Sequence, residues 1–120
     1  MSFVSCQKKE APQITTVENT EIIELLTPDE FAEHIKNQDV QLIDVRMKSE
    51  FDQGHIEGAK NFHIYGKEFQ DSILTLDKEQ PVYLYCKAGA RSEEASLELK
   101  KAGFKKVYDL KGGFSSFQSQ

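Results

Sequence analysis

Short apolar segments alternate with helix-like segments along most of this chain of 120 residues. The strand-like segments are 21–26, 40–45, 60–65, 82–86 and 105–110, and the helix-like segments are 27–38, 66–76 and 91–103. Apolar runs of this length between polar residues are typical of buried parallel strands, and their alternation with helices indicates βα units. The sequence therefore predicts an α/β domain in which helices cover both faces of a parallel sheet.

Local signals support several of these elements. Thr27 is a candidate N-cap, Pro28 fits the first helical position, and Glu30 completes a capping box. Gly103 is a stop signal for the helix that begins near Arg91. Two segments remain less defined: 48–59 is interpreted as a helical turn followed by loop, and 112–118 as a short terminal helix or turn.

Composition excludes several functional classes. The formal net charge of -5 argues against a nucleic-acid partner, because phosphate contact needs a basic surface. No apolar run approaches the roughly 18 residues that cross a bilayer. The two cysteines form no disulfide framework, and no spacing of Cys and His resembles a metal site, so no metal is predicted.

The first 20 residues are polar and aperiodic, and they are interpreted as a flexible leader before a domain that spans 21–120. Within the leader, FVSCQKKE is similar to the end of a lipoprotein signal, with Ser5 before Cys6. Two interpretations stay open. A truncated signal would put a lipid on Cys6 and the domain in the cell envelope or periplasm, whereas a chance match would leave a surface thiol on a cytoplasmic protein.

Cys86 ends the most apolar predicted strand and is followed at once by a loop and a helix. Ligands of open α/β sheets bind at the carboxyl ends of strands, so this position favours a site over a buried core cysteine. The loop amides and the helix N-terminus can form an anion-binding nest, and Gly89 allows a tight turn. Lys87 and Arg91 add positive charge, and together these features stabilise a thiolate. The predicted substrate-binding residues are Lys87, Ala88, Gly89, Ala90, Arg91 and Ser92.

Three motifs in this order resemble the rhodanese-like sulfurtransferases. CKAGARS (86–92) is similar to their active-site loop, LIDVRMKSEFDQGHIEGAKNF (42–62) to their central stretch, and VYDLKGGF (107–114) to their closing segment. Phe117 departs from the family pattern, where many members have tryptophan, and we expect a change of packing only.

The resemblance implies a three-layer α/β/α fold with a central five-stranded parallel sheet, a persulfide on Cys86, and no cofactor. The implied partners are a small anionic sulfur donor such as thiosulfate, a thiol or cyanide acceptor, and a sulfur-acceptor protein. Lys87 and Arg91 would hold the donor, with Arg91 suited to a bidentate grip. Asp44 and Arg46 either line the pocket or form a charge pair that holds neighbouring loops, and the second interpretation is favoured. His55 is interpreted as a loop-packing residue rather than a base.

Two alternatives to sulfur transfer stay open. Dual-specificity phosphatases and arsenate reductases also use a loop cysteine and arginine, but their loop is one residue longer than the four residues between Cys86 and Arg91. A shorter loop suits sulfur better than a tetrahedral phosphate. The other alternative is a non-catalytic rhodanese-like binding or regulatory module, although silent members usually lack the cysteine.

Overall fold

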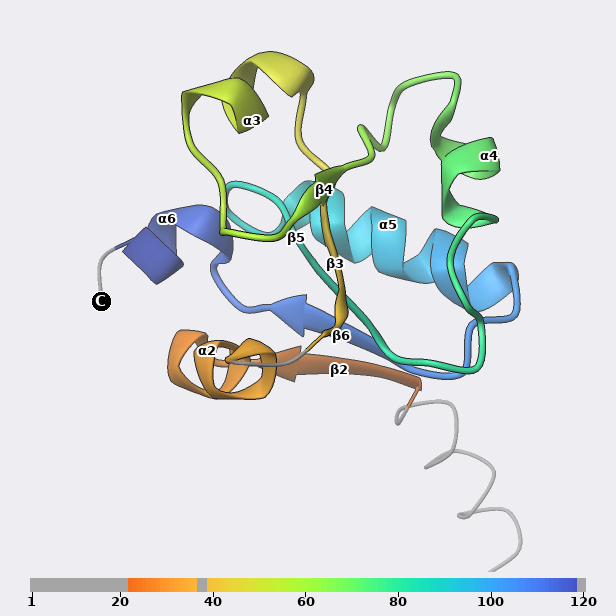
Figure 1. Ribbon diagram of the computed structural model, residues 1–120, viewed down its shortest axis with the longest axis horizontal. Helices are drawn as coiled ribbons and strands as arrows, with labels where there is room; N and C mark the ends of the chain where they lie inside the picture. Colours follow the sequence, from red (N-terminus) through yellow and green to blue (C-terminus); the bar gives the residue numbers. More distant parts are fainter. Residues whose placement is uncertain (1–21, 37–38, 119–120) are drawn as a thin grey trace, which may run out of the picture.

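The computed structural model describes residues 22–36 and 39–118, so the predicted leader and Cys6 lie outside the described residues. A five-stranded sheet has the order β2-β6-β5-β3-β4, and every neighbouring pair is parallel (Figure 1). Its strands are β2 (Ile23–Leu26), β3 (Gln41–Asp44), β4 (Lys60–Asn61), β5 (Val82–Tyr85) and β6 (Val107–Leu110). The helices are α2 (Pro28–Ile35), α3 (Lys48–Gln53), α4 (Phe69–Ile73), α5 (Ala90–Lys101) and α6 (Gly113–Gln118).

The central strand β5 divides the core into two clusters. Val82, Leu84 and Cys86 belong to the cluster that includes buried residues of α4 and α5, whereas Tyr83 and Tyr85 belong to the cluster that includes Phe31 of α2. This alternation follows from the strand geometry, in which successive side chains point to opposite faces. The predicted three-layer α/β/α fold with a five-stranded parallel sheet is confirmed.

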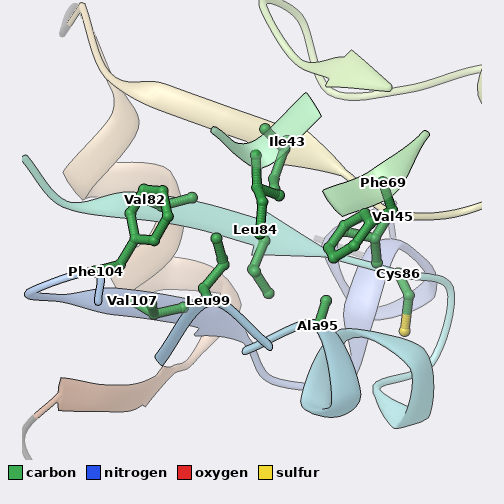
Figure 2. Packing of buried hydrophobic residues seen from close by; sticks show 11 residues of the cluster. Ile43, Val45, Phe69, Val82, Leu84, Cys86, Ala95, Leu99, Phe104 and Val107 are labelled. Atoms are coloured by element: carbon green, nitrogen blue, oxygen red, sulfur yellow. The ribbon is translucent and has the colours of Figure 1, made fainter. Parts of the chain in front are cut away.

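Helix α5 packs on the sheet through small side chains. Ser92, Ala95 and Ser96 are buried along with Leu99, and Figure 2 shows Ala95 and Leu99 on the same side of the sheet as the row Val82, Leu84 and Cys86. Small residues allow the helix backbone to approach the strands closely, so Cys86 meets the first turn of α5. The helix ends as predicted, with Gly103 at φ 97°, a conformation that glycine adopts without strain.

The capping box at α2 forms as the sequence predicts. The N–H of Glu30 donates to Thr27 Oγ1 at 3.2 Å, and the N–H of Thr27 donates to Glu30 Oε1 at 2.9 Å. Two backbone donors at the helix start are thereby satisfied. Phe31 is fully buried one turn into the helix and anchors α2 to the second core cluster.

Two segments differ from the sequence-based expectation. The predicted strand 60–65 is wrong beyond Asn61, because the chain stays beside β3 only briefly: Phe62 and Ile64 donate their N–H groups to Asp44 O (2.9 Å) and Val45 O (3.1 Å), and a turn follows. In segment 48–59 the helical part extends to a full α3, whose start is stabilised by Glu50 accepting the Met47 N–H at 3.1 Å. None of the helices described is long and apolar enough to cross a membrane.

Candidate active site

Cys86 follows β5 directly and is almost completely buried, with 1% of its surface exposed. The N–H of Gly89 donates to its Sγ at 3.0 Å, and Sγ lies 3.5 Å from the Ser92 hydroxyl, which in turn donates to Gly89 O at 3.1 Å. Gly89 has φ 125°, so the backbone can fold back over the sulfur without the strain another residue would meet. We call residues 86–91 the cysteine loop.

Helix α6, which comes last in the described sequence, binds the cysteine loop through two backbone hydrogen bonds. Phe114 donates its N–H to Cys86 O at 2.8 Å, and Ser115 donates its N–H to Lys87 O at 3.0 Å. Gly113 makes this approach possible, since a Cβ there would lie 2.4 Å from Lys87 O and 2.7 Å from Cys86 O. The backbone carbonyls of Cys86 and Lys87 thereby receive hydrogen bonds from α6.

Arg91, predicted to hold the donor, forms an ion pair within the protein. Its Nη1 and Nη2 donate to Glu50 of α3 at 2.8 and 3.2 Å. This hydrogen bonding lowers the pKa of Glu50 to about 2, so the carboxylate stays ionised at neutral pH. Lys87 is exposed, and within residues 22–36 and 39–118 no salt bridge involves it. Lys87 is therefore the loop cation that remains available to an incoming anion.

Asp44 and Arg46 form a buried charge pair at the end of β3. Arg46 donates to the Asp44 carboxylate through Nε at 3.0 Å and Nη2 at 2.7 Å, and Nη2 also donates to Gly54 O at 2.7 Å. The Arg46 guanidinium lies 4.5 Å from the centre of the Phe114 ring. These contacts tie β3, the segment after α3 and α6 together around the cysteine loop, as in the scaffolding interpretation, and Arg46 also lines a cavity beside the loop.

The remaining predicted loop residues differ in exposure, and His55 packs against α3. Ala88 and Ala90 are exposed on the loop, and Ser92 is buried beneath it. His55 stacks on Phe51 with ring centres 3.7 Å apart, and its Nδ1 hydrogen-bonds to Phe51 O at 2.8 Å, as expected of a packing residue.

Glu50 and Gly113 are the residues that sequence reasoning missed. Glu50 lies 41 positions before Arg91, and Gly113 falls in the segment 112–118, which the sequence predicts only as a short terminal helix or turn. The sequence indicates Glu50 only through its position, next to Phe51, in the stretch 42–62 that resembles the family.

A cavity of about 270 Å³ lies beside the loop, with Arg46, Glu50, Lys87 and Phe114 among its lining residues. No group of three or more His, Cys, Asp or Glu side chains within the described ranges is placed to hold a metal ion. The arrangement offers a buried sulfur with an amide donor directed at it and one exposed cation nearby. Such a site suits nucleophilic chemistry of sulfur with a small partner.

Comparisons with known proteins agree with this fold. The rhodanese-like domain family matches residues 27–120. The uncharacterized protein YqhL of Bacillus subtilis is 41% identical over 96 residues, which cover 80% of this chain and 73% of that protein. The thiosulfate sulfurtransferase GlpE of Coxiella burnetii is 34% identical over 87 residues, covering 72% of this chain and 79% of that protein.

Two further similarities are to a longer enzyme and to a solved crystal structure. A tRNA uridine(34) hydroxylase of Aster yellows witches'-broom phytoplasma is 37% identical over 98 residues, which cover 77% of this chain but only 31% of the hydroxylase. The crystal structure of a rhodanese-like domain protein from Staphylococcus aureus superposes with a TM-score of 0.70 at 25% identity, covering 78% of this chain and 90% of that one. The chain belongs to the rhodanese-like domain family.

Proposed function

We propose that this protein is a sulfurtransferase that carries a sulfane sulfur on Cys86. The observation that carries the proposal is the position of Cys86 Sγ, which lies at the carboxyl end of the central strand, 3.0 Å from the Gly89 amide nitrogen. An amide that donates to sulfur stabilises a thiolate, and loop amides directed at the outer sulfur would stabilise the anionic persulfide in the same way. The similarity to GlpE, which is named a thiosulfate sulfurtransferase, supports the same conclusion.

The reaction would proceed in two displacements. In the first, the Cys86 thiolate attacks the sulfane sulfur of thiosulfate, a new S–S bond forms, the S–S bond of thiosulfate breaks, and sulfite leaves with the bonding electrons. In the second, the thiolate of an acceptor attacks the outer sulfur of the persulfide, and Cys86 leaves as a thiolate. No net oxidation occurs, and cyanide can replace the thiol as acceptor to give thiocyanate.

The charges of Glu50, Arg91 and Lys87 decide how strongly the cysteine loop would attract an anionic donor. Glu50 neutralises Arg91, and Lys87 supplies the remaining positive charge at the loop. A small anionic donor would be held by this one cation and by the loop amides. A low-molecular-weight persulfide could use the same contacts and is a second candidate donor. A thiol or cyanide, and in the cell a sulfur-acceptor protein, would take the sulfur. The net charge of -5 supports the absence of a nucleic-acid partner.

Mass spectrometry of the intact protein tests the proposal. Incubation with thiosulfate or with a persulfide donor should add the mass of one sulfur atom, removable by dithiothreitol. Cys86→Ser should abolish the adduct and the transfer to cyanide, whereas the matched Cys6→Ser variant should retain both. Equal loss in the two variants, or no adduct from any donor, would contradict a single persulfide on Cys86.

Other activities have less support. A phosphatase would need its loop arginine to bind phosphate, but Arg91 is held by Glu50. Hydrolysis of an aryl phosphate by the wild type above the level of Cys86→Ser would favour that alternative. The hydroxylase relative shares only about a third of its length with this chain, so the shared domain does not by itself imply hydroxylation.

A further inference from the structure

A larger cavity, of about 880 Å³, lies beside the cysteine loop, and the site described above does not account for it. Gly89 of the loop lines it together with residues of β2, α5 and β6, chiefly Ile23, Leu25, Glu93, Ser96, Leu97 and Asp109. Its volume falls in the range of cavities that bind small molecules.

Two residues that line this cavity each carry a buried polar atom with no hydrogen-bond partner among the described residues, although the Asp109 carboxyl also interacts with the Ser92 side chain. The two atoms are Oδ1 of Asp109 and Oγ of Ser96, and their residues are only 3% and 1% exposed. A buried polar atom without a partner is unfavourable, because it has lost its hydrogen bonds to water without replacement. An ionised carboxylate can only accept hydrogen bonds, so a ligand that satisfies Asp109 must bring a donor.

The charge in the cavity favours a cation. Asp109 of β6 is near Glu93 of α5, and the further charged residues in the lining are Glu24 of β2 and Lys111 after β6. Glu24 is paired with Lys106 at 3.0 Å. Burial raises the pKa of Asp109 to about 6, which leaves its carboxyl mostly ionised at pH 7.5.

The walls also offer apolar contact. Leu25 of β2 and Leu97 of α5 line the cavity and are 59% and 48% exposed. An aliphatic chain placed against them would remove apolar surface from water, which favours binding.

We propose that this cavity binds a small molecule that carries a primary ammonium group on a short aliphatic chain. The ammonium donates to Asp109 Oδ1 and Ser96 Oγ, and the chain lies against Leu25 and Leu97. Because Gly89 lines the cavity and also donates to Cys86 Sγ, the ligand lies next to the backbone that positions the sulfur.

A titration followed by ¹H–¹⁵N NMR tests the proposal with n-butylammonium chloride as the probe and the full chain as the protein. At pH 7.5 we expect saturable shifts at the amides of Gly89, Leu97 and Asp109. 1-Butanol has the same chain without the charge and should bind roughly tenfold more weakly, since a hydrogen bond to a charged group is worth roughly 1.5–3 kcal/mol. Butyrate should cause no saturable shift.

Three variants complete the test. Asp109→Asn should lose the preference for butylammonium over butanol, and Ser96→Ala should weaken butylammonium binding severalfold. Asp71→Asn, the same change at an exposed position of α4, should leave both affinities unchanged. If Asp109→Asn does not fold, Ser96→Ala decides the outcome.

Equal affinities for butylammonium and butanol would overturn the proposal, as would shifts away from the cavity, an unchanged preference in a folded Asp109→Asn, or unchanged affinity in Ser96→Ala. The binding readout uses no sulfur transfer, so its failure is separate from a failure of the proposed function.

Discussion

The charged residues around Cys86 are held in different ways. Arg91 and Arg46 each donate to a carboxylate within the protein, whereas Lys87 is exposed beside the sulfur. Paired guanidinium groups fix the positions of neighbouring segments, and an exposed ammonium is available to a ligand. The three cations therefore divide into two that are paired within the protein and one that stays exposed beside the cysteine loop.

Replacing Lys87 with alanine should weaken the attraction for thiosulfate. We expect the KM for thiosulfate to rise roughly threefold, because an exposed charge contact is worth 0.2–1 kcal/mol. The KM for an uncharged persulfide donor should change little. Steady-state kinetics with both donors measures the difference, and Lys36→Ala, an exposed lysine at the end of α2, is the control. Equal effects on both donors would contradict the steering role.

Replacing Glu50 with glutamine should destabilise the protein in a pH-dependent way. Arg91 lowers the pKa of Glu50 to about 2 from 4.5, so the stabilisation is complete above about pH 4.5 and is lost as the pH falls toward 2. We expect Glu50→Gln to lower the free energy of unfolding by about 1 kcal/mol at pH 7, and by less at pH 3.

Urea denaturation at both pH values measures the effect of Glu50→Gln. Glu57→Gln, at an exposed carboxylate in the turn after α3, serves as the control and should show no such difference. A cost for Glu50→Gln that is the same at pH 3 and pH 7 would argue against the ion pair with Arg91.

At the scale of elements, α3 and α6 are both short, and each contacts the cysteine loop through one end. Glu50 in the first turn of α3 binds Arg91, and the first turn of α6 donates to the carbonyls of Cys86 and Lys87. Helices of six residues have little stability alone, so these contacts and the packing of Phe114 and Phe117 hold them in place.

A methyl group at Gly113 should separate α6 from the loop. The added Cβ would lie 2.4 Å from Lys87 O, and the residue has φ 67°. We expect Gly113→Ala to lower the free energy of unfolding by about 2–4 kcal/mol, from the clash and the left-handed backbone together, and to slow persulfide formation.

Gly58→Ala is a matched control for Gly113→Ala. Gly58 also has a positive φ, 90°, but a Cβ there would meet nothing within 4 Å. Its cost should be limited to the backbone conformation, about 1–2 kcal/mol. Thermal or urea unfolding of the two variants compares them, and equal losses would show that the contact between α6 and the loop contributes little.

Elements defined by local signals could be predicted from the sequence, and long-range contacts could not. The capping box of α2 and the strand, loop and helix around Cys86 depend on neighbouring residues, and they form as expected. The partner of Arg91 lies 41 positions away, and Gly113 approaches the loop only in the folded state. Strand β4 is shorter than its apolar run because the chain turns away from β3 after two residues.

At the scale of the whole molecule, a buried carboxylate on β6 opposes stability at neutral pH. Burial raises the pKa of Asp109 from 3.8 to about 6, so the folded state binds a proton more tightly than the unfolded chain. Stability from this group is therefore present below about pH 4 and is lost as the pH rises through 6.

Asp109→Asn should remove this dependence on pH. Between pH 5 and pH 7.5 the wild type should lose about 1 kcal/mol more of its free energy of unfolding than the variant does. Urea denaturation of both proteins at the two pH values measures the difference, with the exposed Asp71→Asn as a control. Parallel losses in wild type and variant would show that Asp109 titrates in the folded protein as it does in the unfolded chain.

The contact of α6 with the carbonyls of Cys86 and Lys87 also orders events during synthesis. Since α6 is the last described helix to leave the ribosome, a nascent chain can complete the sheet before α6 binds the carbonyls of Cys86 and Lys87. The loop around the sulfur is therefore completed only after Gly113 and the first turn of α6 have been synthesised, and a chain that stalls before Gly113 carries a thiol without these contacts.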